Sequence, residues 1–363
     1  MYTLVENCNY GFDILTSILP KNEKEVISSR HKIYRKKHVH FSIQPKKLTL
    51  FISYLYQLLW IAVYVKKRNY KAVFANAEVV QNSLIILLGK LLKFKVIPMS
   101  YAEELTVPIY GKTLITKIKY FLLTFAYPKA YKHISCCHYA KNILSNEINI
   151  FQNKINVIPI AYSKEKLKLN IKKELNKKTQ NILSVGRLIQ RKGFGELIEV
   201  VKELKIEMPL LKLNIVGSGP LENILRKKVL KDNLQDYIVI HGKLSDDQLA
   251  ELYLKSDLFV LAHRMLNNGE TEGSPVTFAE AAIYKIPSIG GINSGASTII
   301  SHNKTGLIIN MKIKSEIKNS IKKLLNNRVL LERMGEAAQK KIMNEHTPEK
   351  IGNDFRMLIK TYI

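Results

Sequence analysis

The sequence predicts an α/β protein made of two domains, each a parallel sheet covered by helices. The chain has 363 residues, 46% of them hydrophobic, which suits two cores better than one. Segments typical of buried strands alternate with helical segments along most of its length. A polar, strongly basic stretch at residues 164–180 interrupts this alternation, and we place the linker there.

The first half is predicted to begin with a helix over residues 1–20 that ends at Pro20. Strands and helices then alternate up to the linker. We predict strands at 25–29, 39–43, 72–75, 95–99, 133–137 and 155–159, and helices at 48–65, 83–92, 113–131 and 139–146.

The second half begins with a clean strand at residues 181–185 and continues as strand and helix to about residue 310. Further strands are predicted at 213–216, 239–242, 257–261, 286–291 and 307–309. Ser245 and Gln248 have the spacing of a capping box that opens a helix. Ligands of such sheets bind beyond the carboxyl ends of the strands, so the segments that follow each strand are the candidate site.

The run from Leu48 to Val65 has eighteen residues without a charge and is followed by Lys66, Lys67 and Arg68. This length is at the lower edge of what spans a bilayer. Because the run contains several polar residues and precedes a predicted strand, we expect a helix packed on the sheet, with an outer edge that dips into a membrane interface. A spanning helix is the alternative.

The chain carries a net charge of +27, and residues 26–77 contain eleven basic residues and no acid. Such a field favours an anionic partner, namely a membrane surface, a nucleic acid or a phosphorylated substrate. A general bias toward lysine explains it equally well. No Cys/His finger or aromatic RNA-binding motif is present in the sequence, so we expect no nucleic-acid partner.

The three cysteines, Cys8, Cys136 and Cys137, have neither metal-site spacing nor a disulfide framework. We expect a reducing, cytoplasmic setting. The N-terminus lacks the pattern of a secretion signal.

The stretch from Thr271 to Gly291 is the strongest candidate for the site. It carries Glu272 and Glu280, and eight residues bring two side chains back to nearly one helical face. The surrounding residues are apolar, so these acids need partners. The alternative interpretation is two solvated glutamates on an ordinary helix.

Two further strand ends carry suitable groups. Arg187 and Lys192 follow the strand at 181–185, and a guanidinium with a mobile ammonium suits a diphosphate. Gly217 opens a small-residue turn, Gly-Ser-Gly-Pro, where a nucleotide approaches the backbone closely. Surface cations are common and the turn is also compatible with a purely structural role.

The order of these motifs resembles that of retaining glycosyltransferases of family 4. The motifs are VGRLIQRKG, NIVGSGPLE, VIHGKLSDDQLAELYLKSDLFVL, GETEGSPVTFAEA and IPSIGGINSGASTIISHNKTGLII. The resemblance implies the GT-B fold, in which two Rossmann-like domains face each other across a cleft. We expect an acceptor domain at 1–165, a nucleotide-sugar domain at 166–345, and a last helix at 346–363 that returns to the first domain.

By this resemblance, Arg187 and Lys192 neutralise the donor diphosphate without a metal or other cofactor. Glu272 binds hydroxyls of the donor sugar near the reacting face, and Glu280 accepts from the ribose hydroxyls. Other donor contacts are expected from Gly217, Gly273, Ser274, Pro275 and Val276.

The first half departs from the family pattern. Relatives begin with a strand and a glycine-rich loop, whereas this sequence begins in what we predict to be the following helix, so we expect the first strand to be missing or very divergent. Where many relatives carry a histidine after the fourth strand, this chain has Tyr101. We expect Tyr101 or Glu104 to handle the acceptor hydroxyl.

The resulting expectation is a metal-independent hexosyltransferase for exopolysaccharide or lipopolysaccharide assembly. It takes a nucleotide-diphosphate sugar as donor and a glycan or lipid-linked acceptor, and it is peripheral on the inner face of the cytoplasmic membrane. The main rival hypothesis is a catalytically impaired homologue that acts as a partner of another transferase. Two more rivals are an epimerase or phosphorylase of the same fold and a nucleic-acid binder.

Overall fold

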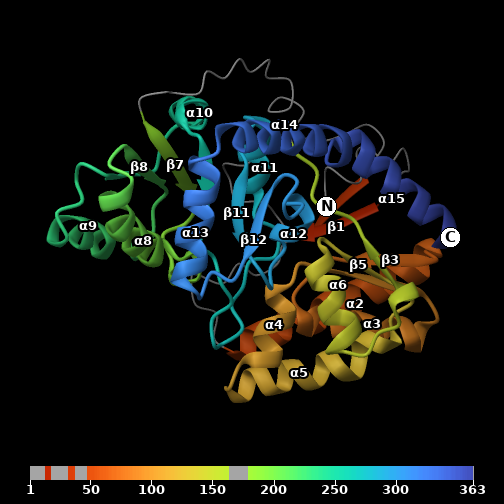
Figure 1. Ribbon diagram of the computed structural model, residues 1–363. Coiled ribbons are helices and arrows are strands. Elements are labelled where there is room, and N and C mark those ends of the chain that lie inside the picture. Colours follow the sequence, from red (N-terminus) through yellow and green to blue (C-terminus); the bar gives the residue numbers. More distant parts are fainter. Residues whose placement is uncertain (1–12, 18–31, 37–46, 163–178, 363) are drawn as a thin grey trace.

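The computed structural model describes residues 13–17, 32–36, 47–162 and 179–362. Its strands form a four-stranded and a six-stranded parallel sheet, with helices packed on both, and a separate parallel pair (Figure 1). The predicted α/β class with two parallel sheets is confirmed.

The smaller sheet has the strand order β3-β4-β5-β6, and all its strands are parallel. Helix α2 precedes it, and the last helix of the chain, α15, also packs on it. The elements are α2 (Lys47–Arg68), β3 (Ala72–Ala75), α3 (Val79–Leu92), β4 (Lys95–Ser100), α4 (Glu103–Tyr110), α5 (Leu114–Ala126), η1 (Tyr127–Lys129), β5 (His133–Ser135), α6 (His138–Asn146), η2 (Gln152–Lys154) and β6 (Ile155–Val157).

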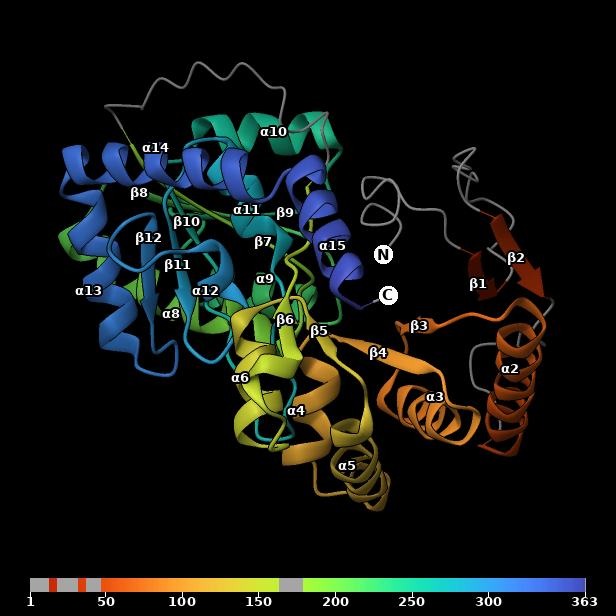
Figure 2. The same cartoon turned by 90° about the vertical axis from the view of Figure 1, so that its right-hand side faces the viewer.

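The two faces of this sheet have different covers because side chains alternate along a strand. Val96 belongs to the core shared with α2, α3, α5 and α6. Its neighbour Ile97 points to the other face, where it packs with Phe355 of α15 (Pro348–Tyr362). Figure 2 shows α15 beside this sheet. The end of the chain therefore lies against the first sheet.

The larger sheet has the order β12-β11-β10-β7-β8-β9 and is parallel throughout. Its strands are buried on both faces, and this explains their nearly continuous apolar sequences. The elements are β7 (Gln180–Val185), η3 (Gln190–Lys192), α8 (Phe194–Glu207), β8 (Leu211–Val216), α9 (Glu222–Lys231), β9 (Ile238–Gly242), α10 (Asp246–Lys255), β10 (Leu258–Val260), α11 (Val276–Ile283), β11 (Ser288–Gly291), α12 (Ala296–Ile299), β12 (Gly306–Ile309), α13 (Lys314–Leu325) and α14 (Arg328–Glu345).

The helix predicted over residues 1–20 is wrong where the structure describes that segment. Asp13–Ser17 form strand β1, which pairs in parallel with β2 (Lys32–Lys36). A short apolar run is compatible with both a helix and a strand, and here pairing with a distant segment decides between them. The strands predicted at 25–29 and 39–43, and nearly all of the linker, lie outside the described residues.

The run from Leu48 to Val65 lies within helix α2, as predicted. Trp60 and Val65 are buried, whereas Leu59 and Val63 are exposed. Among the residues that the structure describes, no helix combines the length and the apolar character needed to cross a bilayer.

Candidate functional site

The candidate site lies where the carboxyl ends of the two sheets meet. Segments that follow β4, β7 and β10 contact one another there, although they are far apart in the sequence. Side chains at such strand ends point beyond the sheet, where ligands of parallel α/β sheets bind.

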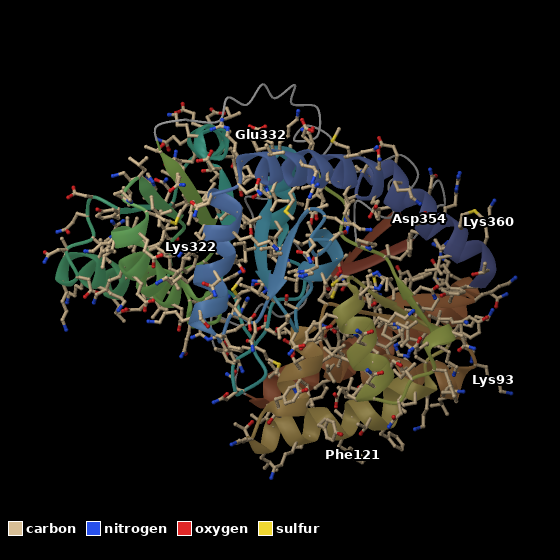
Figure 3. All side chains as sticks on the ribbon, viewed as in Figure 1. Lys93, Phe121, Lys322, Glu332, Asp354 and Lys360 are labelled. Carbon is tan, nitrogen blue, oxygen red and sulfur yellow. The ribbon has the colours of Figure 1, made fainter. Side chains whose placement is uncertain are left out.

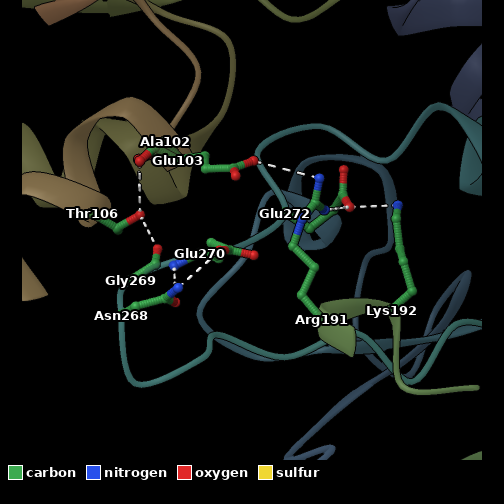
Figure 4. Close-up of polar contacts among 9 residues, drawn as sticks. All are labelled: Ala102, Glu103, Thr106, Arg191, Lys192, Asn268, Gly269, Glu270 and Glu272. Atoms are coloured by element: carbon green, nitrogen blue, oxygen red, sulfur yellow. Dashed lines mark hydrogen bonds and ion pairs between the residues drawn. The ribbon is translucent and has the colours of Figure 1, made fainter. Parts of the chain in front are cut away.

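Glu272 is the centre of this region. Its Oε2 lies 2.6 Å from Nη1 of Arg191 and 2.5 Å from Nζ of Lys192 (Figure 4). The three side chains are only 13%, 11% and 11% exposed. Burial alone raises the pKa of Glu272, but the charges of Lys192 and Arg191 and the hydrogen bond from Lys192 outweigh it and hold this pKa below its usual value. The carboxylate is therefore ionised at neutral pH.

Arg191 also reaches the first half of the chain. Its Nη2 lies 3.5 Å from Oε2 of Glu103 at the start of α4, so one guanidinium joins carboxylates from both halves (Figure 4). Burial raises the pKa of Glu103, Glu270 and Glu272 add to this rise, and Arg191 opposes it. We call Glu103, Arg191, Lys192 and Glu272 the Glu272 cluster.

The turn that carries the two cations is fixed by backbone packing. Gly193 has a φ of 71°, and a Cβ there would lie 1.9 Å from the carbonyl oxygen of Ala262. Arg264 donates its backbone N–H to the carbonyl of Arg191 at 2.9 Å. Only glycine allows η3 to approach the end of β10 this closely.

The loop before Glu272 is held by the first half. Thr106 of α4 donates its hydroxyl to the carbonyl of Gly269 at 2.6 Å (Figure 4). A Cβ on Gly273 would lie 1.9 Å from the carbonyl oxygen of Tyr101. On the other side, Gly295 donates its N–H to the carbonyl of Glu272 at 2.9 Å. These contacts fix the backbone on both sides of the central carboxylate.

Arg187 and Gly217 lie at neighbouring strand ends. Arg187 is exposed just beyond β7, and its charge opposes the rise in the pKa of Glu103. Gly217 follows β8 with a φ of 139°, and a Cβ on it would lie 1.9 Å from the carbonyl oxygen of Gly186. The two loops are thus in backbone contact, which requires glycine at position 217.

Glu280 and Glu272 do not share a helix. Helix α11 begins at Val276, after Gly273, Ser274 and the buried Pro275, so Glu272 belongs to the preceding loop. Glu280 accepts a hydrogen bond from the hydroxyl of the buried Tyr253 at 3.1 Å. The prediction of one shared helical face is therefore wrong, because the helix starts four residues too late.

Tyr101 and Glu104 follow β4. The carboxylate of Glu104 accepts the backbone N–H of Tyr101. Burial raises the pKa of Glu104, which lies at the start of α4. Tyr101 is partly buried, and burial also raises the pKa of its hydroxyl. Of the two adjacent glutamates, Glu103 is the one that faces the cations.

Three residues of this region were not predicted from the sequence: Arg191, Glu103 and His263. His263 is buried directly after β10, with Nδ1 at 3.0 Å from the carbonyl of Leu261 and Nε2 at 2.7 Å from Oγ of Ser294. Burial lowers its pKa to about 4 although Glu272 opposes the shift. The sequence offered only one indication of these residues, namely that each of the three follows the end of a strand.

A family model matches the second half of the chain. Residues 165–341 match the family described as Glycosyl transferases group 1. The amylovoran biosynthesis glycosyltransferase AmsK of Erwinia amylovora is 31% identical over 42% of this chain and 37% of that relative. A GDP-mannose-dependent alpha-(1-6)-phosphatidylinositol monomannoside mannosyltransferase of Mycobacterium tuberculosis is 28% identical over 44% of this chain and 41% of its own length. The chain thus spans about two fifths of the length of these relatives.

Solved structures match nearly the whole chain. Sucrose-phosphate synthase from Thermosynechococcus elongatus has a TM-score of 0.76 at 17% identity, over 99% of this chain and 90% of that chain. The lipopolysaccharide outer core galactosyltransferase WaaB has a TM-score of 0.69 at 14% identity, over 92% and 85%. At such identities the likeness concerns the fold, and it confirms the predicted GT-B fold.

Proposed function

The chain belongs to the glycosyl transferases group 1 family, and we propose that it is a retaining hexosyltransferase that moves a sugar from a nucleotide-diphosphate sugar to a glycan or lipid-linked acceptor. The observation that carries the proposal is the Glu272 cluster, where an ionised acid and two cations meet at the carboxyl ends of both sheets. The relative named for amylovoran biosynthesis favours a role in cell-surface polysaccharide assembly.

The cations fit the leaving group. Arg187 and Lys192 follow the same strand, β7, and together they offer a planar set of donors and a mobile ammonium. We propose that they neutralise the diphosphate as the bond to the sugar breaks, so the reaction needs no metal. We propose that backbone N–H groups at the N-terminus of α11, in the segment from Gly273 to Val276, also donate to the diphosphate.

Glu272 fits the donor sugar. Arg191 and Lys192 both contact the same oxygen of its carboxylate, Oε2. A bound diphosphate competes with Glu272 for Lys192, and this oxygen then becomes free to accept hydrogen bonds from the sugar hydroxyls. An ionised carboxylate suits this role because it is only an acceptor of hydrogen bonds. The loop contacts described above keep the carboxylate in position during this exchange.

Glu280 and Gly217 fit the nucleoside. Tyr253 orients the carboxylate of Glu280, which we propose accepts from the ribose hydroxyls. The turn at Gly217 lets the nucleotide approach the backbone.

On the acceptor side we propose Tyr101 and, in preference to Glu104, its neighbour Glu103. Glu104 already accepts the backbone N–H of Tyr101. Glu103 is 43% exposed and lies beside Arg191, next to the donor carboxylate Glu272. A carboxylate placed there suits an incoming hydroxyl as proton acceptor.

We also propose that the protein is peripheral on the cytoplasmic face of the membrane. The net charge of +27 supports this, because the inner leaflet is anionic. A lipid-linked acceptor is presented at the same surface.

Calorimetric titration with UDP, GDP and their sugars tests donor binding without knowledge of the acceptor. We expect one nucleotide sugar to bind. Glu272→Gln should weaken binding of the nucleotide sugar roughly tenfold or more relative to binding of the free nucleotide, because only the nucleotide sugar carries the sugar hydroxyls that the Glu272 carboxylate accepts from. Glu251→Gln, at an exposed position of α10, is the matched control. If no nucleotide or nucleotide sugar binds, the proposal is wrong.

Donor hydrolysis separates this proposal from its rivals. Slow release of sugar that Glu272→Gln abolishes indicates an active transferase. Binding without any turnover, even with acceptors, indicates the impaired homologue. An isomerised sugar or a dependence on phosphate indicates an epimerase or a phosphorylase.

A further inference from the structure

Helix α5 turns an apolar stripe toward solvent. Its members recur every three or four residues, and this spacing places them on one helical face. They are Leu114, Ile118, Phe121 and Phe125, which are 74%, 52%, 62% and 46% exposed, together with Ile115 at 53%. On the opposite side of the helix, Leu123 and Ala126 are fully buried. Figure 3 shows Phe121 at the outer edge of the molecule.

Basic residues flank this stripe, and the helix contains no acid. Lys112 and Lys117 are exposed, and Lys129 lies over the ring of Phe125 at 3.5 Å. Lys119 pairs with Glu78 at 3.5 Å. Aromatic and aliphatic side chains with lysines beside them characterise helices that lie in the plane of a membrane interface.

The fold orients the stripe. Helix α5 packs against α3 and α4, on the side of the four-stranded sheet that also carries α2, while α15 covers the other face. Helix α4, which bears Glu103, precedes α5 by only three residues. A surface held by α5 is therefore close in the chain to the acceptor side of the candidate site.

We propose that the exposed stripe of α5 docks on an anionic lipid bilayer, with its aromatic and aliphatic residues in the interface and the flanking lysines on lipid headgroups. The inference rests on the proposed function only in that a transferase acting on lipid-linked acceptors works at a membrane. It assigns the contact to α5, whereas the sequence had pointed to the run at residues 48–65.

A bilayer fits this surface better than a second copy of the chain. Pairing two copies through this stripe places the exposed Lys112 and Lys117 of both copies at one interface, and no acid on α5 compensates them. Anionic headgroups supply the missing charge along the whole helix.

Flotation with vesicles tests the proposal on the full chain. We expect binding to vesicles of phosphatidylcholine mixed with phosphatidylglycerol, much weaker binding to phosphatidylcholine alone, and a decline with salt. Ile118→Glu combined with Phe121→Glu is expected to weaken binding roughly tenfold or more. Matched controls are Ile206→Glu and Val329→Glu, at residues 83% and 78% exposed in the second half. Equal binding by the α5 variant and the controls would overturn the assignment.

Fluorescence gives a second measurement, which does not depend on weakening the contact. Trp60 is the only tryptophan and is buried, so it contributes a constant background. In the Phe121→Trp variant, the fluorescence emission of the new tryptophan is expected to shift to the blue on anionic vesicles. Lipids with brominated acyl chains are expected to quench it. Neither change is expected for Ile206→Trp. If neither signal changes, or if light scattering shows a dimer that Ile118→Glu with Phe121→Glu abolishes, the bilayer is not the partner. Donor titration of the same variants reports on the proposed function separately.

Discussion

Glu103 and Glu104 are adjacent in the sequence, yet their carboxylates have different surroundings. Glu103 lies 3.5 Å from Arg191, while Glu104 accepts the backbone N–H of Tyr101. Between strand β4 and this pair, Ala102 is fully buried and has a φ of 107°. Non-glycine residues adopt such a conformation at a cost and only where packing imposes it, often at functional sites. The strained turn directs Glu103 toward the second half.

Substitution of each glutamate by alanine is expected to have opposite consequences. Glu104→Ala leaves buried N–H groups without their acceptor and should lower the free energy of unfolding by about 1–2 kcal/mol. Glu103→Ala should change that energy by less than about 0.5 kcal/mol but lower kcat with acceptor by roughly a hundredfold, as loss of a general base does. Donor affinity, measured by titration, should stay close to that of the wild type in both.

Chemical denaturation and steady-state transfer assays on the two variants provide the comparison. If Glu103→Ala retains full turnover, Glu103 does not act on the acceptor. Equal losses of stability in both variants would mean that Glu103 is structural as well.

The sequence predicted the residues that a local pattern marks. Lys192 and Glu272 both stand at strand ends within motifs, and the structure brings them to 2.5 Å. Glu103 and Arg191 were not predicted, because their contact joins residues 88 positions apart and depends on how the two halves pack. Local spacing carries no information on such a contact.

At the scale of elements, the loop before α11 is held by close backbone contacts. Gly273 touches Tyr101, and a Cβ on Gly295 would lie only 1.6 Å from the carbonyl oxygen of Gly273. Neither φ lies in the left-handed region, so space alone requires glycine at both positions. The loop that presents Glu272 therefore depends on contact with the first half.

Gly273→Ala is expected to impair the protein, and Gly195→Ala serves as its matched control. A Cβ at position 273 would lie 1.9 Å from the carbonyl oxygen of Tyr101, so either the loop or the two halves of the molecule must shift. We expect this shift to lower the free energy of unfolding by about 1–3 kcal/mol and to abolish donor binding. In α8 the nearest atom to a Cβ on Gly195 is a side-chain carbon of Leu225 at 4.0 Å, and alanine there should stabilise by about 0.5–1 kcal/mol. Thermal melts and donor titrations of both variants measure this. A Gly273→Ala protein with native stability and affinity contradicts the packing argument.

Most elements followed from the alternation of apolar segments, because buried parallel strands are nearly continuous apolar runs. The capping box at Ser245 and Gln248 is confirmed, since it depends only on residues three apart. Strand β1 was predicted as helix, because its pairing with β2 is not encoded locally. Likewise, the start of α11 at Val276 is set by the loop contacts of Gly273 and not by the spacing of the glutamates.

At the scale of the whole molecule, α15 joins the end of the chain to the first sheet. Phe355 packs edge-on against Phe74 of β3, with ring centroids 5.3 Å apart. We therefore propose domains at 1–165 and 166–345, with 346–363 belonging structurally to the first. The two cores are then linked twice, at the linker and at α15.

Each core also buries a histidine, and this makes the stability of the molecule depend on pH. Burial lowers the pKa values of His133, in β5, and of His263, after β10, to about 4. In the unfolded chain a histidine has a pKa of about 6.5. Between these values the unfolded state binds more protons, so stability falls as the pH is lowered from 6.5 toward 4. At pH 5 the expected loss is on the order of 2 kcal/mol for each of the two.

The comparison of wild type with His133→Gln isolates this effect. Burial raises the pKa values of Glu103 and Glu104, and these acids act in the opposite sense on acidification, but they are the same in both proteins. We expect the free energy of unfolding, measured by denaturant titration at pH 7, 6 and 5, to fall less steeply in the variant. At pH 5 the difference should equal the loss expected for one buried histidine, on the order of 2 kcal/mol. His133→Gln itself costs stability at pH 7, since it loses the contact of the ring with the carbonyl of Tyr127 at 3.0 Å. The two curves should therefore converge as the pH falls, and parallel curves would show that folding does not lower the pKa of His133.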